Sequence, residues 1–382
     1  MTKFPVEALI NNTPAYYYDL DLLRETLNTI NRCTKEHPYF VHYAVKANAN
    51  SVLLNVIREA GLGIDCVSGY EVQTAIDAGF EPGKIAFAGV GKTDKEILLA
   101  LHHKIGCFNV ESLPEIDVIN QLAGQVGDTA NICIRVNPNI DAHTHKYITT
   151  GLSENKFGIN LESLDDVIKH VKSCDNICLK GLHFHIGSQI LNLEPFELLC
   201  DTINGIIKAF QAKGTTFEII NVGGGLGIDY DNPDANPIAD FDTFFNIFNS
   251  KLQLSPNQEV HFELGRSIVA QCGSLIATVT YGKEGTEKKF VIVDAGMSDL
   301  IRPALYQAHH KIQNITAEEG SETDTYDVVG PICESADVFG TDEVLPITKR
   351  GDIIAIRSAG AYGEIMASRY NCRPFAKSVF SE

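Results

Sequence analysis

Lys46 closes a short apolar run, HYAVKAN, over residues 42–48. An ammonium group among apolar neighbours loses its proton near neutral pH more readily than one in water, and the free amine can attack a carbonyl carbon. Most lysines at strand ends are solvated surface charges, however, so the residue type alone is weak evidence. Lys46 is a candidate nucleophile only in the company of other functional groups.

A glycine-rich segment and an acid–arginine pair lie further along the chain. NVGGGLGIDY, residues 221–230, holds four glycines in five positions, where a tight turn needs only one. Without Cβ atoms, the backbone N–H groups there can approach a phosphate closely. HFELGR, residues 261–266, adds Glu263 and Arg266, and an arginine can complete a clamp for a phosphate or a carboxylate. A salt bridge between these two side chains is the alternative interpretation.

Two histidines stand two residues apart in LHFHIGSQ, residues 182–189, and so lie on the same side of an expected strand. His183 and His185 could bind a metal, as an HxH motif does in barrel hydrolases, or one of them could pack flat against the ring of a cofactor. A metal site needs further histidines and an aspartate at other strand ends. Because His143 and His145 fall in an expected loop, the metal interpretation is disfavoured. A buried, hydrogen-bonded histidine is expected for one of the pair.

These residues need a scaffold that brings strand ends together. Eight short apolar runs, bounded by Gly, Pro, Asn or Asp, alternate with stretches whose apolar residues recur at helical spacing. Eight such units in about 230 residues favour an α/β fold, a (β/α)8 TIM barrel, over an open doubly wound sheet. In such a barrel the functional groups gather at the C-terminal strand ends. The expected strands are 40–45, 63–68, 84–89, 106–111, 131–137, 179–187, 217–224 and 259–265.

After Arg266 the pattern changes to strands with period-two alternation and few convincing helices. We therefore expect a C-terminal β-rich domain, a β-sandwich or a small β-barrel, over residues 267–382. The barrel is expected over residues 26–266. An N-terminal segment, residues 1–25, with a strand-like stretch at 14–20, is expected to associate with the β-rich domain.

Composition limits the kinds of partner. The chain has 382 residues, 44% hydrophobic and 21% charged, with a net charge of −18 and a pI of about 5.1, so a nucleic-acid partner is disfavoured. No apolar stretch approaches the ~20 residues of a membrane span, and the N-terminus lacks the apolar core of a secretory signal. The ten cysteines are irregularly spaced, with no CxxC, so no metal site is predicted. We expect a cytoplasmic protein.

The motifs at residues 42–48, 182–189, 221–230 and 261–266, in this order, resemble the alanine-racemase-type barrel of pyridoxal-phosphate enzymes, and within it the decarboxylases of basic amino acids. Four further motifs are similar to those of the diaminopimelate decarboxylases: HTHKYITTG with KFGI, DAGMSDLIRPALY, GPICESAD and GAYG. The resemblance covers the chain from about residue 14 onward, and eight motifs in register make it specific. One departure is Leu264, where the family usually has proline.

The resemblance implies pyridoxal 5'-phosphate as cofactor. Lys46 would bind its aldehyde covalently, Glu263 would keep the pyridine nitrogen protonated, and His185 would stack on the ring. A protonated ring withdraws electrons best from the carbanion left when carbon dioxide departs. Ser188, Gly225 and Arg266 would hold the phosphate, with Tyr362 reaching the cofactor from the second domain. The full implied set is Lys46, His185, Ser188, Gly225, Glu263, Gly265, Arg266 and Tyr362.

The implied reaction is decarboxylation of meso-diaminopimelate to L-lysine and carbon dioxide, the last step of lysine biosynthesis. Arg266, Arg302 and Tyr306 would bind the distal carboxylate, Tyr362 would also contact substrate, and Glu334 would bind the distal ammonium group. Cys333 would return a proton to the α-carbon and so be catalytic with Lys46. In this family the loop with Cys333 and Glu334 enters the neighbouring subunit, which implies a homodimer with shared active sites.

Three alternatives remain open at this point. A carboxynorspermidine or ornithine-type decarboxylase could use the same scaffold, although HTHKYITTG and RPALY disfavour it. A non-catalytic protein that binds pyridoxal phosphate would lack a catalytic group, but Lys46, Glu263 and Cys333 are all present. A metal-dependent barrel hydrolase would lose activity to a chelator and regain it with zinc.

Overall fold

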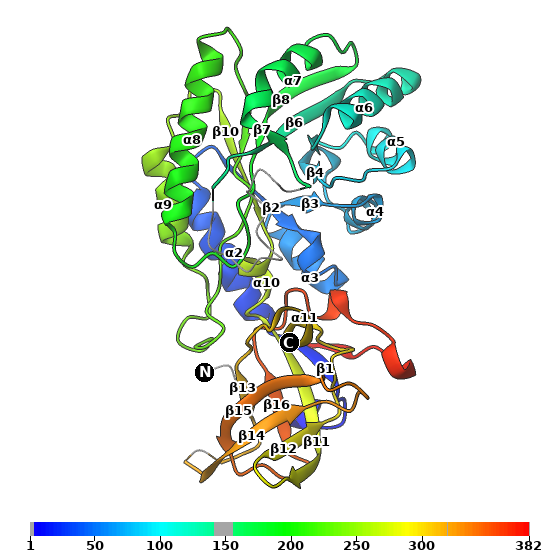
Figure 1. Ribbon diagram of the computed structural model, residues 1–382, viewed down its shortest axis with the longest axis vertical. Coiled ribbons are helices and arrows are strands. Elements are labelled where there is room, and N and C mark those ends of the chain that lie inside the picture. Colours follow the sequence, from blue (N-terminus) through cyan, green and yellow to red (C-terminus); the bar gives the residue numbers. More distant parts are fainter. Residues whose placement is uncertain (1–3, 141–155, 319, 382) are drawn as a thin grey trace. The chain divides into compact units, whose positions relative to one another are not determined.

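The computed structural model describes residues 4–140, 156–318 and 320–381 (Figure 1). The chain divides into two compact units, a barrel unit of residues 27–227 and 240–265 and a β-rich unit of residues 1–26, 228–239 and 266–382. The expected boundaries at residues 25 and 266 fall within one residue of these limits. Segment 228–239, which the sequence analysis left in the barrel, groups with the β-rich unit. The motif HTHKYITTG, with His143 and His145, lies outside the described residues.

The barrel unit contains eight parallel strands that close on themselves, which confirms the predicted (β/α)8 barrel. The strands pair in the order β5-β4-β3-β2-β10-β9-β8-β6, and β6 pairs with β5 to close the ring; β7 (Ile159–Asn160) extends β6. Each strand falls on one of the eight apolar runs. The strands are β2 (Tyr39–Ala44), β3 (Gly63–Cys66), β4 (Ile85–Phe87), β5 (Cys107–Val110), β6 (Ala130–Asn137), β8 (Ile177–His183), β9 (Ile219–Asn221) and β10 (Glu259–Leu264).

Helices surround this ring (Figure 1). Polar residues cap the starts of several of them: the side chain of Asn50 accepts from the α3 backbone, and Thr93 forms a capping box with Glu96 in α5. Among the described residues, no helix is long and apolar enough to span a membrane. The helices are α2 (Leu20–Thr34), α3 (Ser51–Glu59), α4 (Gly69–Asp77), α5 (Asp94–His103), α6 (Leu113–Val126), α7 (Leu164–Val171), α8 (Glu194–Gln211) and α9 (Phe241–Lys251).

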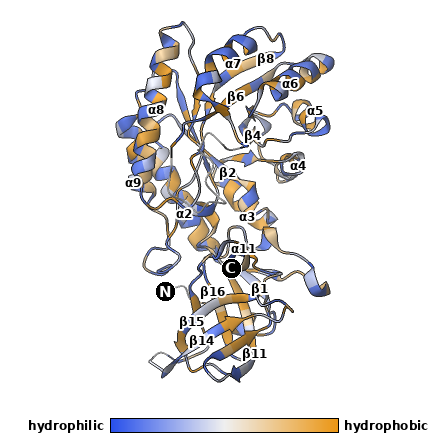
Figure 2. Ribbon diagram, viewed as in Figure 1, coloured by the Kyte–Doolittle hydropathy of each residue, from blue (hydrophilic) through white to orange (hydrophobic). Residues whose placement is uncertain are grey.

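Aromatic packing joins α9 to the barrel wall. The rings of Phe244, Phe245 and Phe248, on one side of α9, all contact Phe262 of β10, with centroids 4.9–5.8 Å apart in edge-on geometry. Such pairs stabilise beyond the apolar area they bury, by about 0.5–1.5 kcal/mol. Figure 2 shows that helix α8 likewise carries both hydrophobic and hydrophilic residues along its ribbon. These contacts fix β10, which carries Glu263.

The β-rich unit is an eight-stranded, mostly antiparallel sheet, which confirms the predicted C-terminal β domain. Six strands run in the order β13-β16-β11-β12-β14-β15; β1 pairs antiparallel with β11 and parallel with β17. Its core includes Leu9, Tyr17, Ile276, Ile353 and Ala355. The elements are α1 (Val6–Leu9), β1 (Ala15–Tyr18), α10 (Arg266–Val269), β11 (Gly273–Glu284), β12 (Lys289–Val293), α11 (Arg302–Tyr306), β13 (Ile312–Asn314), β14 (Thr323–Val329), β15 (Val338–Pro346), β16 (Ile353–Ile356) and β17 (Lys377–Phe380).

Candidate active site

Lys46 lies in a single 3₁₀ turn, Val45–Ala47, directly after β2, so its amine stands at the C-terminal end of the first barrel strand. Its Nζ is 2.8 Å from Oδ2 of Asp65 on β3. The Lys46 side chain is 40% exposed, whereas that of Asp65 is 1% exposed. Burial, followed by the charge of Glu263, raises the pKa of Asp65 to about 7 against the opposing effect of Lys46. The Asp65 carboxyl can therefore exchange a proton beside the amine near neutral pH.

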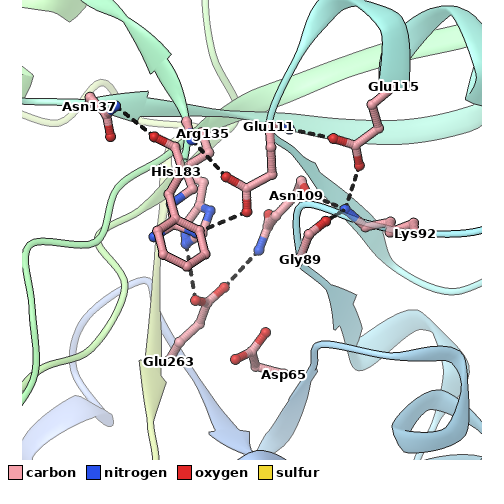
Figure 3. Close-up of polar contacts among 12 residues, drawn as sticks. Asp65, Gly89, Lys92, Asn109, Glu111, Glu115, Arg135, Asn137, His183 and Glu263 are labelled. Carbon is pink, nitrogen blue, oxygen red and sulfur yellow. Dashed lines mark hydrogen bonds and ion pairs between the residues drawn. The ribbon is translucent and has the colours of Figure 1, made fainter. Parts of the chain in front are cut away.

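Glu263 is a buried carboxylate whose two oxygens are both hydrogen-bonded (Figure 3). The side-chain amides of Asn109 and Asn221 donate to Oε1 at 2.8 and 2.7 Å, and Nε2 of His183 lies 3.0 Å from Oε2. Burial alone would raise the pKa of Glu263, but His183, Lys46 and the hydrogen bond from Asn221 outweigh it and hold the pKa well below its usual range. The carboxylate thus stays ionised at neutral pH.

Strand register explains why these side chains meet. His183 on β8 pairs with Asn221 on β9, and Asn221 pairs with His261 on β10, two residues before Glu263. Glu263 itself pairs with His42 on β2. Residues two apart point to the same face of a strand, so the three polar side chains face one another inside the ring.

The glycine-rich segment packs so closely that side chains could not fit. A Cβ on Gly223 would lie 2.2 Å from the Phe184 carbonyl oxygen, and one on Gly224 would lie 1.9 Å from that of Glu263. The amide of Gly224 donates to Nδ1 of His185 at 3.3 Å. Close packing of β8, β9 and β10 therefore demands two of the glycines by itself. The amide of Gly225 has no hydrogen-bond acceptor among the described residues, so it is available to an anion.

His185 follows β8 and is half-buried. Burial, followed by the charges of Arg135 and Lys46, lowers its pKa to about 3, so the ring is neutral at pH 7. Ser188 lies three residues later and is also half-buried. Gly265 follows β10, and a Cβ there would meet the Ala47 side chain at 3.0 Å. Gly265 is thus fixed by its packing against the turn that carries Lys46.

These barrel residues suit pyridoxal phosphate. The amine of Lys46 can bond to an aldehyde, and the ionised Glu263 can pair with a protonated ring nitrogen. Within the part of the chain described, Oδ1 of Asp65 and Nδ1 of His183 are buried without a hydrogen-bond partner, which indicates that a polar group belongs beside them. The amide of Gly225 supplies a donor of the kind that phosphates take.

A second cluster of polar residues lies in the β-rich unit. Arg266 and Arg302 both donate to the hydroxyl of Tyr230, at 2.7 and 3.0 Å. Burial would raise the pKa of Tyr230, but the two arginines lower it overall. The guanidinium of Arg266 lies 4.9 Å from the centre of the Tyr362 ring. The role of Arg266 and Tyr362 toward the cofactor stays a prediction from the sequence.

Arg302 holds a positive charge in a buried position, with 6% of the residue exposed. Its second partner is Nε2 of His310, 2.9 Å away, while Nδ1 of His310 contacts the Arg357 carbonyl oxygen at 2.8 Å. Since that carbonyl needs a donor, Nδ1 carries the proton and Nε2 accepts from Arg302. Burial, followed by the charge of Arg302, lowers the pKa of His310 to about 3. Among the described residues Arg302 has only these uncharged partners, so it can take an anion.

The remaining predicted residues are more exposed. Tyr306 ends α11 and is half-buried, and Cys333 and Glu334 are exposed in the segment between β14 and β15. Glu334 accepts a hydrogen bond from the hydroxyl of Tyr370 rather than contacting the arginines. Thus the β-rich unit brings Arg266 and Arg302 together at Tyr230, with Tyr362 against Arg266, and leaves Cys333 and Glu334 exposed.

Several site residues escaped the sequence analysis, namely Asp65, Asn109, Glu111, Arg135, Asn221 and Tyr230. All but the last are polar residues at or near the ends of apolar runs, such as GIDCV and CIRVN. A polar residue within an apolar strand is a sign of a functional site, because polar side chains are seldom buried without a role. The sequence contains this sign at each of these positions except Tyr230. Of the HxH pair, His183 is fully buried and contacts Glu263, whereas His185 is half-buried and accepts from the Gly224 amide. Among the described residues, the one group with metal-ligand spacing is Asp117, His170 and Cys174, apart from both histidines.

Comparison with known proteins identifies the family. Residues 20–270 match the family model described as pyridoxal-dependent decarboxylase, pyridoxal binding domain. A diaminopimelate decarboxylase of Bacteroides thetaiotaomicron is 56% identical over 381 residues, covering 99% of this chain and 98% of the relative. One from Vibrio cholerae is 41% identical over 99% of this chain and 90% of its own length.

Solved structures agree with these relatives. The diaminopimelate decarboxylase of Helicobacter pylori complexed with L-lysine has a TM-score of 0.92 and 41% identity, covering 98% of this chain and 94% of that one. The lysine/ornithine decarboxylase of Vibrio vulnificus complexed with putrescine, at 22% identity and a TM-score of 0.85, shares the fold. The predicted family, cofactor and enzyme class are confirmed. The chain belongs to the diaminopimelate decarboxylase family of pyridoxal-dependent decarboxylases and is a carboxy-lyase that uses pyridoxal 5'-phosphate.

Proposed function

We propose that this enzyme converts meso-diaminopimelate to L-lysine and carbon dioxide, the last step of lysine biosynthesis, with the residues described above. The observation that carries the proposal is Glu263, a carboxylate held ionised by two amides and an imidazole in the same barrel as Lys46. A carboxylate at this position favours a protonated cofactor ring, which suits decarboxylation. The relatives with this name match nearly the whole chain.

The barrel residues bind and orient the cofactor. When bound, pyridoxal phosphate supplies an electron sink for the charge that develops as carbon dioxide leaves. Lys46 would hold the cofactor's aldehyde carbon, and Asp65 would take or give a proton at Nζ. Glu263 would keep a proton on the ring nitrogen, and the neutral His185 would bind the ring. The amide of Gly225 and the hydroxyl of Ser188 would donate to the phosphate, and Gly265 would keep the Lys46 turn in place.

The arginine cluster selects the substrate. Arg302 and Arg266 bind the distal carboxylate of meso-diaminopimelate, and Tyr306 adds a hydroxyl. Each charge-assisted hydrogen bond of this kind contributes about 1.5–3 kcal/mol. Ornithine has no distal carboxylate, so it would leave the buried charge of Arg302 uncompensated and be rejected. The buried Arg302, with only uncharged partners among the described residues, supports this assignment.

Catalysis is completed by an exposed segment. Cys333 returns a proton to the α-carbon, and Glu334 binds the distal ammonium group. Because both residues are exposed, they are available to a second copy of the chain, and we include a cytoplasmic homodimer with shared active sites in the proposal. A two-fold axis would exchange the two segments.

One assay tests the substrate. Purified protein saturated with pyridoxal phosphate is given meso-diaminopimelate, ornithine, lysine or carboxynorspermidine, and carbon dioxide is measured. We expect release from meso-diaminopimelate alone. Release from ornithine or carboxynorspermidine, without release from meso-diaminopimelate, would overturn the proposal.

A second assay tests Cys333. We expect Cys333→Ala to keep the coloured cofactor and to lose most turnover, because only the proton return is affected. Cys174→Ala, which changes a half-buried cysteine after α7, is the matched control and should leave both unchanged. Full turnover in Cys333→Ala would remove this residue from the mechanism.

A further inference from the structure

Lys92 is a lysine buried inside the barrel unit, with 1% of its side chain exposed (Figure 3). Its Nζ donates to three acceptors: the Gly89 carbonyl at 2.9 Å, the Asn109 carbonyl at 2.8 Å and Oε1 of Glu115 at 2.5 Å. A lysine ammonium has three donors, and all three are used. Lys92 therefore joins the chain after β4, the strand β5 and the first turn of α6 at one point.

Glu115 extends this contact to the end of β5. While its Oε1 accepts from Lys92, its Oε2 accepts from the backbone N–H of Glu111 at 2.7 Å. The pair of Lys92 and Glu115 therefore holds the backbone of residues 109–111 at both ends, at the carbonyl of Asn109 and at the amide of Glu111. In a strand, the side chains of residues 109 and 111 share one face.

Both of these side chains act inside the barrel. The amide of Asn109 donates to Oε1 of Glu263 at 2.8 Å. Glu111 accepts from Nη1 of Arg135 at 2.9 Å and from the backbone N–H of Gly158 at 2.8 Å. Figure 3 shows these contacts running without a break from Lys92 to Glu263. The shortest route is Lys92, the Asn109 backbone, the Asn109 side chain and then Glu263.

Stability alone does not account for this arrangement. A buried ion pair loses hydration on folding, and well-packed apolar residues in its place are often as stable or more so. What the four directed hydrogen bonds of this ion pair add is geometry: three are donated by Lys92, and the fourth is donated by the Glu111 backbone amide to Glu115. The backbone that it fixes carries a direct donor to the carboxylate on which the reaction depends.

We propose that Lys92 is a positioning residue for the decarboxylation: with Glu115 it fixes the end of β5 and so holds the Asn109 amide on Glu263. The inference deepens the proposed function, because it rests on the role given there to Glu263. A displacement of about 1 Å at a supporting residue can lower turnover by as much as about 10²-fold.

A double-mutant cycle tests the route. Lys92→Met, Asn109→Ala and the combined variant are compared with the natural chain. The affinity of the cofactor-free protein for pyridoxal phosphate is measured by absorbance titration, and kcat and KM are measured with meso-diaminopimelate. Lys180→Met is the matched control, because Lys180 is another barrel lysine in an ion pair, with Glu218 at 2.8 Å.

We expect Lys92→Met to weaken cofactor binding by about tenfold and to lower kcat by roughly 10- to 100-fold, with KM changed by less than about threefold. Asn109→Ala should lower cofactor affinity and kcat to a similar extent. Adding Lys92→Met to Asn109→Ala should lower either quantity by less than about a further threefold, because the effects of substitutions along one route are not additive. Lys180→Met should match the natural chain.

Two results would overturn the proposal: cofactor affinity and kcat within about twofold of the natural chain in Lys92→Met, or effects of Lys92→Met and Asn109→Ala that multiply in full. If Lys92→Met does not fold because Glu115 is left charged and buried, Lys92→Met/Glu115→Gln removes both charges and is measured in its place. Failure to decarboxylate meso-diaminopimelate would sink the proposed substrate, whereas the cofactor titration would still decide the role of Lys92.

Discussion

The barrel unit and the β-rich unit each bury a charged side chain of the candidate site, Glu263 and Arg302, but the two charges are neutralised in different ways. In the barrel, Glu263 receives three hydrogen bonds from protein groups, and Arg135 is paired with Glu111. In the β-rich unit, the described partners of Arg302 are a phenol and a neutral imidazole. Glu263 and Arg135 are therefore compensated within the fold, while the described partners of Arg302 supply no counter-charge, which the proposed function assigns to the substrate.

This difference separates two requirements of catalysis. A group that must keep one ionisation state throughout, such as Glu263, is best fixed by the protein itself. A group that must discriminate between substrates gains most when the correct substrate supplies its only counter-charge, because the wrong one then leaves a buried charge unpaired. The second arrangement lowers the stability of the free protein, as active sites often do.

The largest expected effect concerns Lys46, the partly exposed cation at the mouth of the barrel. Lys46→Ala removes the amine to which we propose the cofactor is attached, so it should abolish the visible absorbance of the bound cofactor, with turnover reduced by roughly 10³-fold or more. Lys84→Ala, at a lysine near Glu81 that is about half exposed, is the control and should keep both. A normal visible band in Lys46→Ala would exclude this residue as the attachment point.

The two units, and the positions of Lys46 and Glu263 within the barrel, could be predicted from the sequence. Each barrel strand is a local apolar run with turn residues at its ends, and Lys46 and Glu263 stand at strand ends within the quoted motifs. The switch to period-two alternation after Arg266 likewise marks the β-rich unit. Local pattern was sufficient for these features because each depends on neighbours in the chain.

The partners of these residues could not be predicted in the same way. Asn109 and Asn221 reach Glu263 only because the ring closes between β5 and β6 and because β8, β9 and β10 pair in one register. That register joins residues far apart in sequence. Strand β9 is also shorter than expected: it ends at Asn221, before the glycines whose close packing leaves no room for a Cβ. Segment 228–239, with Tyr230, similarly joins the β-rich unit through contacts distant in sequence.

The second prediction tests whether the hydrogen bonds to the buried carboxylate of Glu263 stabilise the barrel. Glu263→Leu leaves two amides and His183 buried without their acceptor, so the free energy of unfolding of the cofactor-free protein should fall by about 3–5 kcal/mol. Glu263→Gln keeps an acceptor for the amides and should lose clearly less. Denaturant midpoints of the two variants provide the measurement. Equal midpoints for Glu263→Leu and Glu263→Gln would mean that these hydrogen bonds do not stabilise the barrel.

The third prediction concerns the other side of the comparison. Arg302→Met removes a buried charge that lacks a counter-charge among the described residues, so the unfolding midpoint of the free protein should stay level or rise. Activity should suffer instead: kcat/KM for meso-diaminopimelate should fall by roughly 10- to 150-fold, the equivalent of about 1.5–3 kcal/mol, with cofactor affinity unchanged. Strong destabilisation with unchanged kcat/KM would show that Arg302 is a structural residue.

The smallest expected effect concerns a histidine pair in the barrel strands. Nε2 of His42 lies 3.0 Å from Nδ1 of His261. Burial lowers the pKa of both rings to about 4, helped in His42 by the charge of His261. Each native pKa lies below that of an unfolded histidine, about 6.5, so the stability that the neutral rings confer is complete above that pH and is lost as the pH falls through about 4.

Between pH 7 and pH 5, the natural chain should therefore lose about 1–2 kcal/mol more unfolding free energy than His261→Gln, which cannot take up a proton. Denaturant titrations of the cofactor-free proteins at several pH values measure this difference. His310 of the β-rich unit gives the contrast, because burial and the charge of Arg302 lower its pKa to about 3. The stability that its neutral ring confers is therefore lost down to a lower pH than in the barrel pair. Arg302→Met should raise the pH at which this loss is complete. If the natural chain and His261→Gln lose unfolding free energy in parallel down to pH 4, the pair of His42 and His261 is not a source of acid sensitivity. The barrel would then stabilise the protonated rings of these histidines as well as its other charged groups.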